Sequence, residues 1–396
     1  MSKLSKKENS KLLSDGQSID RRHFISKSSK FVAGGIMANS LMQQLDVPKN
    51  KSEKAESTLE YRTLGNTGLK VTAVGYGAMR TTDPALLAHA LDLGINIVDT
   101  AHVYQGGNNE KLVGNVLNNR RKDVILCTKL KQKSVEQMMR DFEISLKRLK
   151  TDYIDILYLH SARRISDIQN EDYMKFYQKL KKQGKVRFIG FSTHSNETEL
   201  VNQAAQDKFW DVILVAFNFS KEKALSEAIK VAAQSGIGIV AMKTQAGGYE
   251  TEEMGDLSPH QAALKWVLQS EGVHTTIPGV KTFDELNEDF QVMNTKLGWN
   301  DRKTLYHYGN AIRNKYCVGC NACKEQCPYG VDIPEVNRCF MYYEGYRDID
   351  LARSSYADLS AKTNASKCGL CAECKVICPH GIDIAARMKN VNNILV

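Results

Sequence analysis

From residue 69 onward the chain alternates short β-rich runs with amphipathic stretches, and this alternation constrains the fold more than any other feature. It is typical of βα units that build a parallel sheet. The expected strands, each followed by a helical segment until about residue 293, are Val71–Gly77, Ile95–Thr100, Val124–Lys129, Tyr153–His160, Val186–His194, Val212–Phe219, Gly238–Thr244 and Thr275–Val280. Eight such units in about 230 residues predict an α/β fold, a (β/α)8 TIM barrel with its functional site at the C-terminal strand ends.

The third predicted helix shows the pattern most clearly. Its apolar residues recur at helical spacing and fall on one face, as expected of a helix that packs against a barrel. They are Val135, Met138, Met139, Phe142, Leu146 and Leu149.

Four ionisable residues lie at consecutive strand ends or in the adjoining loop, namely Asp99, Tyr104, Lys129 and His160. Parallel strands bring these ends together around one mouth. A lysine ammonium beside a tyrosine favours the phenolate and lowers the phenol pKa, while an aspartate holds the lysine. The four residues therefore predict a general acid/base, Tyr104, that serves a carbonyl or alcohol oxygen. Alone, each would be read as an ordinary structural or solvated residue.

Longer motifs around these residues resemble the aldo/keto reductase family over roughly residues 60 to 293. The resemblance is carried by Arg62–Leu69 (RTLGNTGL), Gly94–Ala101 (GINIVDTA) with Tyr104 and Glu110, Ser145–His160 (SLKRLKTDYIDILYLH) and Gly184–Ser192 (GKVRFIGFS). It implies that Asp99, Tyr104, Lys129 and His160 form the catalytic tetrad of that family.

The resemblance also implies a nicotinamide cofactor, NADP(H) or NAD(H). The positions that would bind it are Ser192 and Thr193 after the fifth strand, Met242 on the seventh and Lys281 after the eighth. Of the amide-binding and ring-stacking residues of the family, only the serine is kept. Glu285 would repel a 2′-phosphate, which Lys281 would partly offset. A barrel that keeps the tetrad but has lost or exchanged the nicotinamide is the alternative.

Eight of the ten cysteines stand in two short runs after residue 316. Each run has the spacing CxxCxxCxxxCP, which is typical of proteins that bind two [4Fe–4S] clusters. In such proteins the fourth cysteine of each run serves the other cluster. One cluster is therefore expected on Cys317, Cys320, Cys323 and Cys378, and the other on Cys368, Cys371, Cys374 and Cys327.

These runs resemble bacterial two-cluster ferredoxins and helical ferredoxin-like subunits, the latter because residues 333–361 between the runs read as mostly helical. Zinc is the competing metal, since CxxC pairs also suit it. Four cysteines per run, with proline after the last, favour iron–sulfur clusters. Cys127 and Cys339 stand apart from the runs and are expected to be buried and inert.

The net charge of +9 is concentrated at the N-terminus, where residues 1–54 carry 11 Lys/Arg against 5 Asp/Glu. A nucleic-acid partner therefore loses its main support. The pair Arg21-Arg22 precedes a weakly apolar segment at 31–42, which resembles a twin-arginine export signal. A disordered basic tail is the alternative. The only membrane contact expected is through this signal, if it is uncleaved.

The predicted organisation is a signal at 1–42, a linker at 43–58, a barrel at 59–298 and a cluster domain at 299–396. We expect an exported, periplasmic or membrane-associated oxidoreductase of a small carbonyl or alcohol substrate, whose clusters exchange electrons with a redox partner protein. Two alternatives remain: an electron-transfer protein with a non-catalytic barrel, and clusters that only staple the C-terminal domain. Tyr342, Tyr343 and Tyr346 are expected to serve in helix packing.

Overall fold

The structure is a computed structural model that describes residues 59–251 and 258–396, so the signal and linker predicted at 1–58 lie outside the described residues. Eight strands form one sheet in the order β10-β9-β8-β7-β6-β5-β4-β3, with every neighbouring pair parallel. They are β3 (Tyr76–Gly77), β4 (Ile97–Asp99), β5 (Ile125–Lys131), β6 (Ile154–His160), β7 (Val186–Thr193), β8 (Val212–Ala216), β9 (Gly238–Met242) and β10 (Thr275–Thr276). Parallel bridges from Val74 to Thr276 and from Gly77 to Gly279 join the two edge strands and close the barrel.

The first predicted strand, Val71–Gly77, was wrong as a single element. Its beginning forms β2 (Lys70–Thr72), which pairs antiparallel with β1 (Tyr61–Thr63) in a separate two-stranded sheet. Only its end, β3, enters the barrel. The apolar run continues through both segments because Val71, Ala73 and Val74 are all buried, so composition alone could not show where one strand ends.

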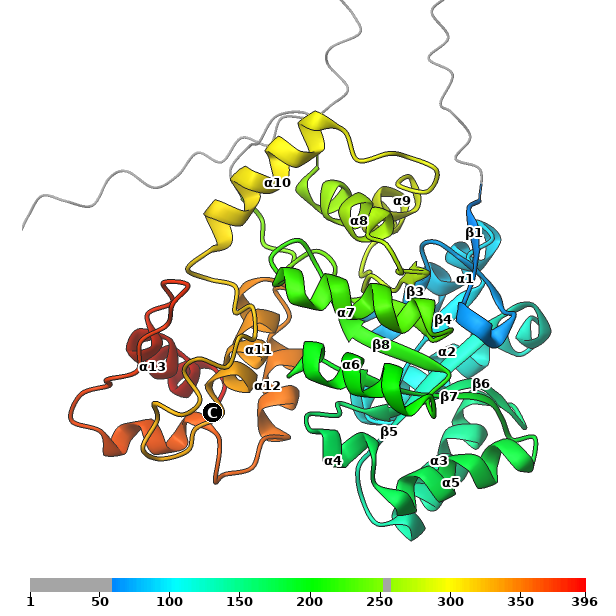
Figure 1. Cartoon of the computed structure of the whole chain (residues 1–396), viewed down its shortest axis with the longest axis horizontal. Helices are drawn as coiled ribbons and strands as arrows, with labels where there is room; N and C mark the ends of the chain where they lie inside the picture. Colours follow the sequence, from blue (N-terminus) through cyan, green and yellow to red (C-terminus); the bar gives the residue numbers. More distant parts are fainter. Residues whose placement is uncertain (1–58, 252–257) are drawn as a thin grey trace, which may run out of the picture. The chain divides into compact units, whose positions relative to one another are not determined.

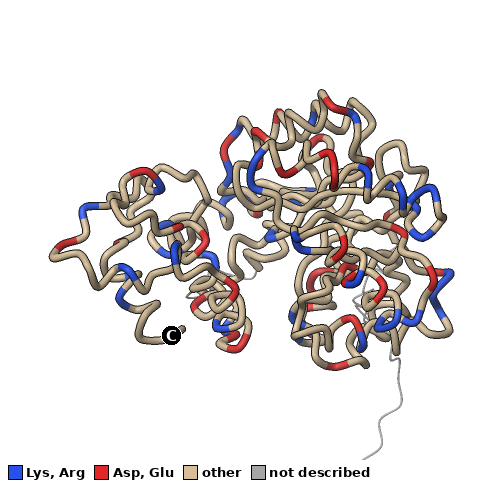
Figure 2. Tube along the Cα trace, turned by 90° about the horizontal axis from the view of Figure 1, so that it is seen from below, with Lys and Arg blue, Asp and Glu red and all other residues tan. Residues whose placement is uncertain are grey.

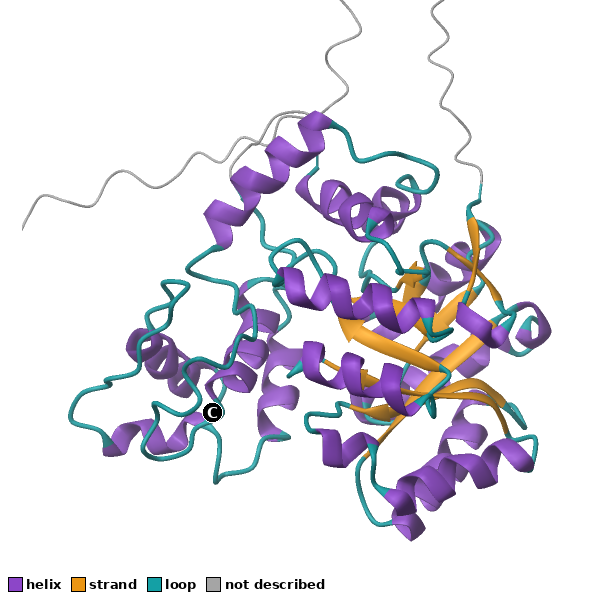
Figure 3. Ribbon diagram, viewed as in Figure 1, coloured by secondary structure: helices purple, strands orange, loops and turns teal. Residues whose placement is uncertain are grey.

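Helices surround the barrel strands, as Figure 3 shows for the central sheet and its cover. They are α1 (Pro84–Asp92), α2 (Asn108–Leu117), α3 (Val135–Leu149), α4 (Ile165–Ile168), α5 (Glu171–Lys182), α6 (Glu197–Asp207), α7 (Lys223–Gln234), α8 (Pro259–Gln269) and α9 (Phe283–Phe290). Short 3-10 turns are η1 (Gly65–Thr67), η2 (Ala78–Arg80), η3 (Tyr104–Gly107) and η4 (Arg121–Asp123). The predicted βα alternation is therefore confirmed.

Helix α3 illustrates why these segments fold as they do. The hydroxyl of Ser134 accepts a hydrogen bond from the backbone N–H of Gln137 and caps the first turn. The predicted apolar face then enters the core, with Phe142 fully buried. Lys150, in the left-handed conformation at φ 54°, ends the helix.

The cysteine-rich region adds four helices and a 3-10 turn after the barrel (Figure 1). They are α10 (Trp299–Ile312), α11 (Ile333–Glu344), α12 (Ile349–Ala357), η5 (Ala365–Leu370) and α13 (Ile384–Ile394). The helical segment expected at 333–361 is confirmed by α11 and α12. A second hydrophobic cluster, which also includes Ala246 and Tyr249 from the barrel, holds this region together, and Tyr308, Val336, Cys339 and Val391 are fully buried in it.

The described residues, 59–251 and 258–396, belong to one compact unit, so the barrel and the cysteine-rich region pack together. The amide of Asn218, just after β8, donates to the hydroxyl of Tyr316 at 2.9 Å. The ammonium of Lys221 donates to the carbonyl of Val318 at 2.7 Å. These bonds join the barrel mouth to the chain at the start of the first cysteine run.

Lys/Arg and Asp/Glu side chains are interspersed along the described chain, as Figure 2 shows. Of the helices within residues 59–251 and 258–396, none has the length and apolar character needed to cross a bilayer.

Candidate functional site

A cavity of about 1160 Å³ lies at the C-terminal ends of the barrel strands. All four residues of the predicted tetrad line it: Asp99 at the end of β4, Lys129 in β5, His160 at the end of β6 and Tyr104 in η3. The structure thus brings together the four side chains that sequence reasoning selected, at the end of the barrel where it expected them.

Lys129 contacts two other members of this group, Asp99 and Tyr104. Its ammonium forms a buried ion pair with Asp99 and donates to the carbonyl of Thr100 at 2.7 Å. It also donates to the hydroxyl of Tyr104 at 3.3 Å. Burial opposes the charged form, but Asp99 and Tyr104 outweigh it and raise the pKa of Lys129. A cation is therefore held beside the phenol.

The pKa of Tyr104 departs from the expected direction. Burial of the phenol raises its pKa and exceeds the opposing effect of Lys129, so the net shift is upward and not downward as predicted. The sequence indicated the cation but not how completely the surrounding structure would exclude water from the phenol. Tyr104 is consequently held protonated, which suits a general acid.

His160 lies beside Tyr104, with ring centroids 6.0 Å apart in an edge-to-face arrangement. Burial lowers its pKa well below the usual histidine value, and the cation of Lys129 adds to that effect. Among the described residues, its Nδ1 atom has no hydrogen-bond partner. The imidazole is therefore neutral and can hydrogen-bond to a ligand in the cavity.

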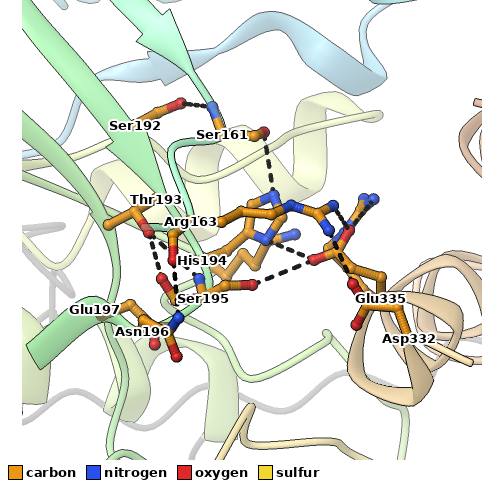
Figure 4. Close-up of polar contacts among 12 residues, drawn as sticks. Ser161, Arg163, Ser192, Thr193, His194, Ser195, Asn196, Glu197, Asp332 and Glu335 are labelled. Atoms are coloured by element: carbon orange, nitrogen blue, oxygen red, sulfur yellow. Dashed lines mark hydrogen bonds and ion pairs between the residues drawn. The ribbon is translucent and has the colours of Figure 1, made fainter. Parts of the chain in front are cut away.

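The predicted nicotinamide residues fall into two groups. Ser192, Met242 and Lys281 line the cavity. Thr193 is fully buried and donates instead to the carbonyl of Ser195 at 2.8 Å. The hydroxyl of Ser192 accepts from the backbone N–H of Ser161 at 2.9 Å, as Figure 4 shows.

Sequence reasoning missed Arg80, which also lines the cavity. Its guanidinium lies 3.5 Å from the carboxylate of Glu285 and donates to the carbonyl of Gly279 at 3.1 Å. The same carboxylate accepts from the backbone N–H of Lys281 at 2.6 Å. The negative charge of Glu285 is therefore paired, and this part of the cavity carries the two cations Arg80 and Lys281. No motif marked Arg80, because its neighbours come from the opposite end of the barrel sequence.

Helix α11 of the cysteine-rich region also reaches the cavity. Glu335 contacts His194 at 3.1 Å and Arg163 at 2.8 Å, a connection drawn in Figure 4. Arg338 donates to the same carboxylate at 2.9 and 3.0 Å. Burial would raise the pKa of Glu335, but Arg338, His194 and Arg163 outweigh it and lower the pKa well below the usual value.

Two tyrosines from this region line the cavity as well, which corrects the packing role predicted for them. Tyr342 lies in α11 and Tyr346 two residues beyond its end, and their rings stack at 5.4 Å. Tyr343 keeps the packing role, since its ring contacts Phe340 at 5.6 Å. The helix pattern could not show this, because the neighbour of α11 at this point is the barrel mouth.

The eight cysteines of the two runs meet in the expected combinations. The members of the first set line one small cavity: Cys317, Cys320, Cys323 and Cys378. In the second set, burial raises the pKa of Cys368 to about 11, with added contributions from the thiols of Cys327, Cys374 and Cys371. Each set thus joins three cysteines of one run to the fourth of the other.

Gln326 holds the two runs together. Its side-chain oxygen accepts from the backbone N–H of Ile377 at 2.8 Å, and its nitrogen donates to the carbonyl of Ile377 at 3.2 Å. These residues directly precede Cys327 and Cys378, the two cysteines that exchange partners between the runs. All ten cysteines are free, and both Cys127 and Cys339 are buried as predicted.

Within the described ranges, no three or more His, Cys, Asp or Glu side chains are close enough to hold a single metal ion. The thiolates of an iron–sulfur cubane bind separate iron atoms, and so they need not converge on one point. Four thiols around one cavity are a donor set that fits such a group.

Comparison with known proteins matches the barrel to one family. The profile of the aldo/keto reductase family matches residues 73–256. The uncharacterized oxidoreductase YqkF of Bacillus subtilis is 28% identical over 281 residues, covering 59% of this chain and 91% of that protein. L-galactose dehydrogenase of Arabidopsis thaliana is 32% identical over 219 residues, covering 49% of this chain and 68% of that protein.

Solved structures give the same fold. The holo form of aldo-keto reductase AKR11C1 from Bacillus halodurans superposes with a TM-score of 0.55 at 24% identity, covering 63% of this chain and 96% of that one. An aldo/keto reductase from Klebsiella pneumoniae in complex with NADP and acetate gives a TM-score of 0.53 at 21% identity, covering 62% and 95%.

Proposed function

The chain belongs to the aldo/keto reductase family and is an oxidoreductase. On this basis we propose that it interconverts a carbonyl and an alcohol group, with Tyr104 as the general acid/base. The observation that carries this proposal is the position of the Tyr104 hydroxyl, 3.3 Å from the ammonium of Lys129, inside the large mouth cavity. His160 lines the same cavity and supplies a neutral hydrogen-bonding group.

In the direction of reduction, Tyr104 donates its proton to the carbonyl oxygen as hydride reaches the carbon. Lys129 stabilises the phenolate that remains, because an adjacent cation favours the charged form. Asp99 keeps that cation in place through the buried ion pair. His160 orients the substrate oxygen toward the phenol.

The hydride would come from NADP(H) or NAD(H), the chemistry that a nicotinamide supplies when bound. The cavity is large enough for a dinucleotide, and Arg80 and Lys281 provide cations suited to its phosphates. The Klebsiella pneumoniae relative was solved with NADP. Ser192 and Met242 line the cavity and are the proposed contacts for the nicotinamide; Thr193, whose hydroxyl is already engaged, would act through its neighbours.

We further propose that the chain carries two [4Fe–4S] clusters, one on each set of four cysteines, which exchange single electrons with a carrier protein. The two mixed sets of thiols support this assignment. Cys317 also lines a small cavity together with His194, Lys243 and Arg338, which face the barrel mouth as well. The first set is thus the one adjacent to the proposed active site.

Residues 1–42 are proposed to direct export by the twin-arginine route, which carries folded proteins, so that clusters assembled inside the cell would remain in place. The protein would then be periplasmic or attached to the membrane through an uncleaved signal. The sequence pattern Arg21-Arg22 before a short apolar segment supports this proposal.

A second candidate function is electron transfer by a protein whose barrel only binds a partner or cofactor. It is favoured by the hydroxyls of Ser192 and Thr193, which already bond to Ser161 and Ser195. It is also favoured by α11, whose Arg338 and Tyr342 occupy part of the mouth.

The decisive experiment mixes anaerobically purified protein with NADPH or NADH and a panel of aldehydes and ketones, and follows nicotinamide oxidation. Tyr104→Phe should lower kcat/KM by about 10²- to 10⁴-fold, the usual contribution of a general acid. Tyr306→Phe is the matched control, because Tyr306 is 69% exposed and is not among the residues that line the cavity. Turnover that survives in Tyr104→Phe would contradict the proposed role, and its absence in the wild type would favour the second function.

A further inference from the structure

The hydroxyl of Tyr342 lies between two cations in the mouth cavity. It accepts a hydrogen bond from the ammonium of Lys243 at 2.9 Å and another from the guanidinium of Arg338 at 2.9 Å. The side chain is only 3% exposed, yet it belongs to the cavity lining together with Tyr104. The cavity lining therefore contains two tyrosines whose hydroxyl oxygens accept hydrogen bonds from cations, Tyr104 from the barrel and Tyr342 from helix α11.

Both cations are directed toward Tyr342 by the surrounding structure. Lys243 directly follows β9 and has φ 55°, a left-handed conformation that is unfavourable for a residue other than glycine. The amide of Asn218 donates to the carbonyl of Lys243 at 2.9 Å and holds that conformation. Arg338 is fixed on its other side by two hydrogen bonds to Glu335.

The partners of these cations differ in kind. Lys129 has the carboxylate of Asp99, and Arg338 has that of Glu335. Lys243 has no carboxylate partner in the part of the chain that the structure describes, and its ammonium points at the oxygen of Tyr342. Lys243 is partly buried, and a phenolate on Tyr342 would supply a negative charge next to its ammonium.

The surroundings shift the pKa values of Tyr342 and Tyr104 in opposite directions. Burial alone would raise the pKa of Tyr342, but Lys243 and Arg338 outweigh it and lower the pKa. Tyr104 has a raised pKa in the same cavity. The same cavity thus lowers the pKa of one phenol and raises that of the other, which suits the two tyrosines to different roles.

We propose that Tyr342 is a substrate-binding phenolate that accepts a hydrogen bond from a hydroxyl group of the substrate, next to the carbonyl served by Tyr104. A phenolate oxygen has three lone pairs, of which Lys243 and Arg338 take two, and the third is free for the ligand. The inference rests on the proposed function and names its substrate class, the hydroxy carbonyl compounds. The cations around Tyr342 are Lys243 after β9 and Arg338 in α11, and Arg80 lies over the ring of the neighbouring Tyr346 at 5.0 Å. The other titratable groups near it are Glu335 in α11, Tyr104 in η3, and Tyr316 before the first cysteine run.

The first test observes the phenolate without any turnover. Ultraviolet difference spectra that distinguish ionised from neutral tyrosine are recorded for the holoprotein from about pH 6 to pH 11, around the ordinary tyrosine pKa. One tyrosine should ionise below that value in the wild type and in Tyr343→Phe, and it should be missing in Tyr342→Phe. Tyr343 is the matched control because it is the next residue of α11, is 38% exposed and contacts Phe340. An unchanged early transition in Tyr342→Phe would overturn the proposal, as would its absence from the wild type.

The second test uses hydroxyacetone and acetone as paired probes. A hydroxyl that donates to the phenolate stabilises the ionised form, so hydroxyacetone should move the early transition to lower pH, whereas acetone should not. This readout does not depend on catalysis, so it still decides the inference if the wild type reduces neither ketone and the proposed function fails. No shift with hydroxyacetone would overturn the assigned ligand class.

Steady-state kinetics then distinguish a loss of substrate specificity from a general loss of activity. The preference for hydroxyacetone over acetone, expressed as a ratio of kcat/KM values, should fall about 10- to 100-fold in Tyr342→Phe, the range for a hydrogen bond to a charged group. Tyr343→Phe should keep the ratio. An equal loss for both ketones would indicate a structural role and would overturn the proposed contact.

Discussion

At the level of single residues, exclusion of water decides which protonation state each mouth side chain adopts. Burial raises the pKa of Tyr104 even though Lys129 opposes it, and burial lowers the pKa of His102, His160 and His194. Lys129 stays cationic because Asp99 is buried with it. The cavity therefore combines a protonated phenol with neutral imidazoles and a paired ammonium.

A pH profile follows from these directions. A histidine whose pKa is lowered is already neutral above its lowered value, so it does not titrate near the ordinary value of 6.5. We expect kcat/KM for carbonyl reduction to stay level as the pH falls from about 8 to about 6. Steady-state kinetics across this range will check the expectation. A transition near 6.5 that disappears in His160→Gln would contradict it.

At the level of secondary-structure elements, α11 is the helix that joins the cysteine-rich region to the barrel mouth. Its Glu335 is 3% exposed and contacts Arg163 and His194 from the barrel. Glu335→Gln leaves the guanidinium groups of Arg163 and Arg338 without a buried counter-charge and should reduce the free energy of unfolding by about 3–5 kcal/mol at pH 7. Urea unfolding measures the difference, and Glu171→Gln is the control, because Glu171 is exposed and forms a surface ion pair with Lys175 on the same helix.

The lowered pKa of Glu335 predicts that its contribution to stability is lost at acid pH. The pKa of Glu335 is lowered in the folded state, so its stabilisation is complete above the ordinary value of 4.5. It is lost as the pH falls from there toward the lowered folded-state pKa. The difference in unfolding free energy between wild type and Glu335→Gln should therefore shrink in acid. A constant difference from pH 7 down to about pH 3 would contradict this assignment.

Helix α3 offers a test of the barrel packing. Phe142 is fully buried in the largest hydrophobic cluster, whereas Ile144 on the same helix is 40% exposed. Phe142→Ala should destabilise the protein by about 3–5 kcal/mol because it leaves a cavity in the core. Ile144→Ala should change stability by less than about 0.5 kcal/mol. Similar losses in both variants, measured by urea unfolding, would contradict the predicted face of the helix.

At the level of the whole molecule, the two cysteine runs are interlocked, since each thiol set draws its fourth member from the other run. Paired substitutions test this connection. Cys320→Ala with Cys378→Ala should retain about half of the wild-type iron and sulfide, because both belong to one set. Cys320→Ala with Cys327→Ala should lose nearly all, because each set loses one member.

Iron and acid-labile sulfide are measured after anaerobic reconstitution, with the wild type as the reference. The reverse result, in which the pair Cys320 and Cys327 retains half, would show that each run serves its own cluster. Wild-type protein that binds no iron would remove the cluster proposal altogether while leaving the barrel assignment intact.

The sequence by itself determined the repeating βα pattern of this protein and the residues that form its candidate sites. The periodicity was sufficient to predict eight parallel strands, because apolar faces must be buried. The positions of the strand ends were sufficient to predict that Asp99, Tyr104, Lys129 and His160 lie at one mouth of the barrel. Local spacing was likewise sufficient to group the cysteines. Such features depend on residues close in the chain or on a regular repeat.

Only the tertiary structure decided what depends on contacts between distant segments. It showed that burial outweighs Lys129 at Tyr104, that Arg80 pairs with Glu285, and that Tyr342 enters the barrel mouth. The physical reason is that desolvation and charge pairing are set by neighbours in space. A helix pattern in residues 333–344 predicts which residues share a face, but the surface that this face meets is supplied by another part of the chain.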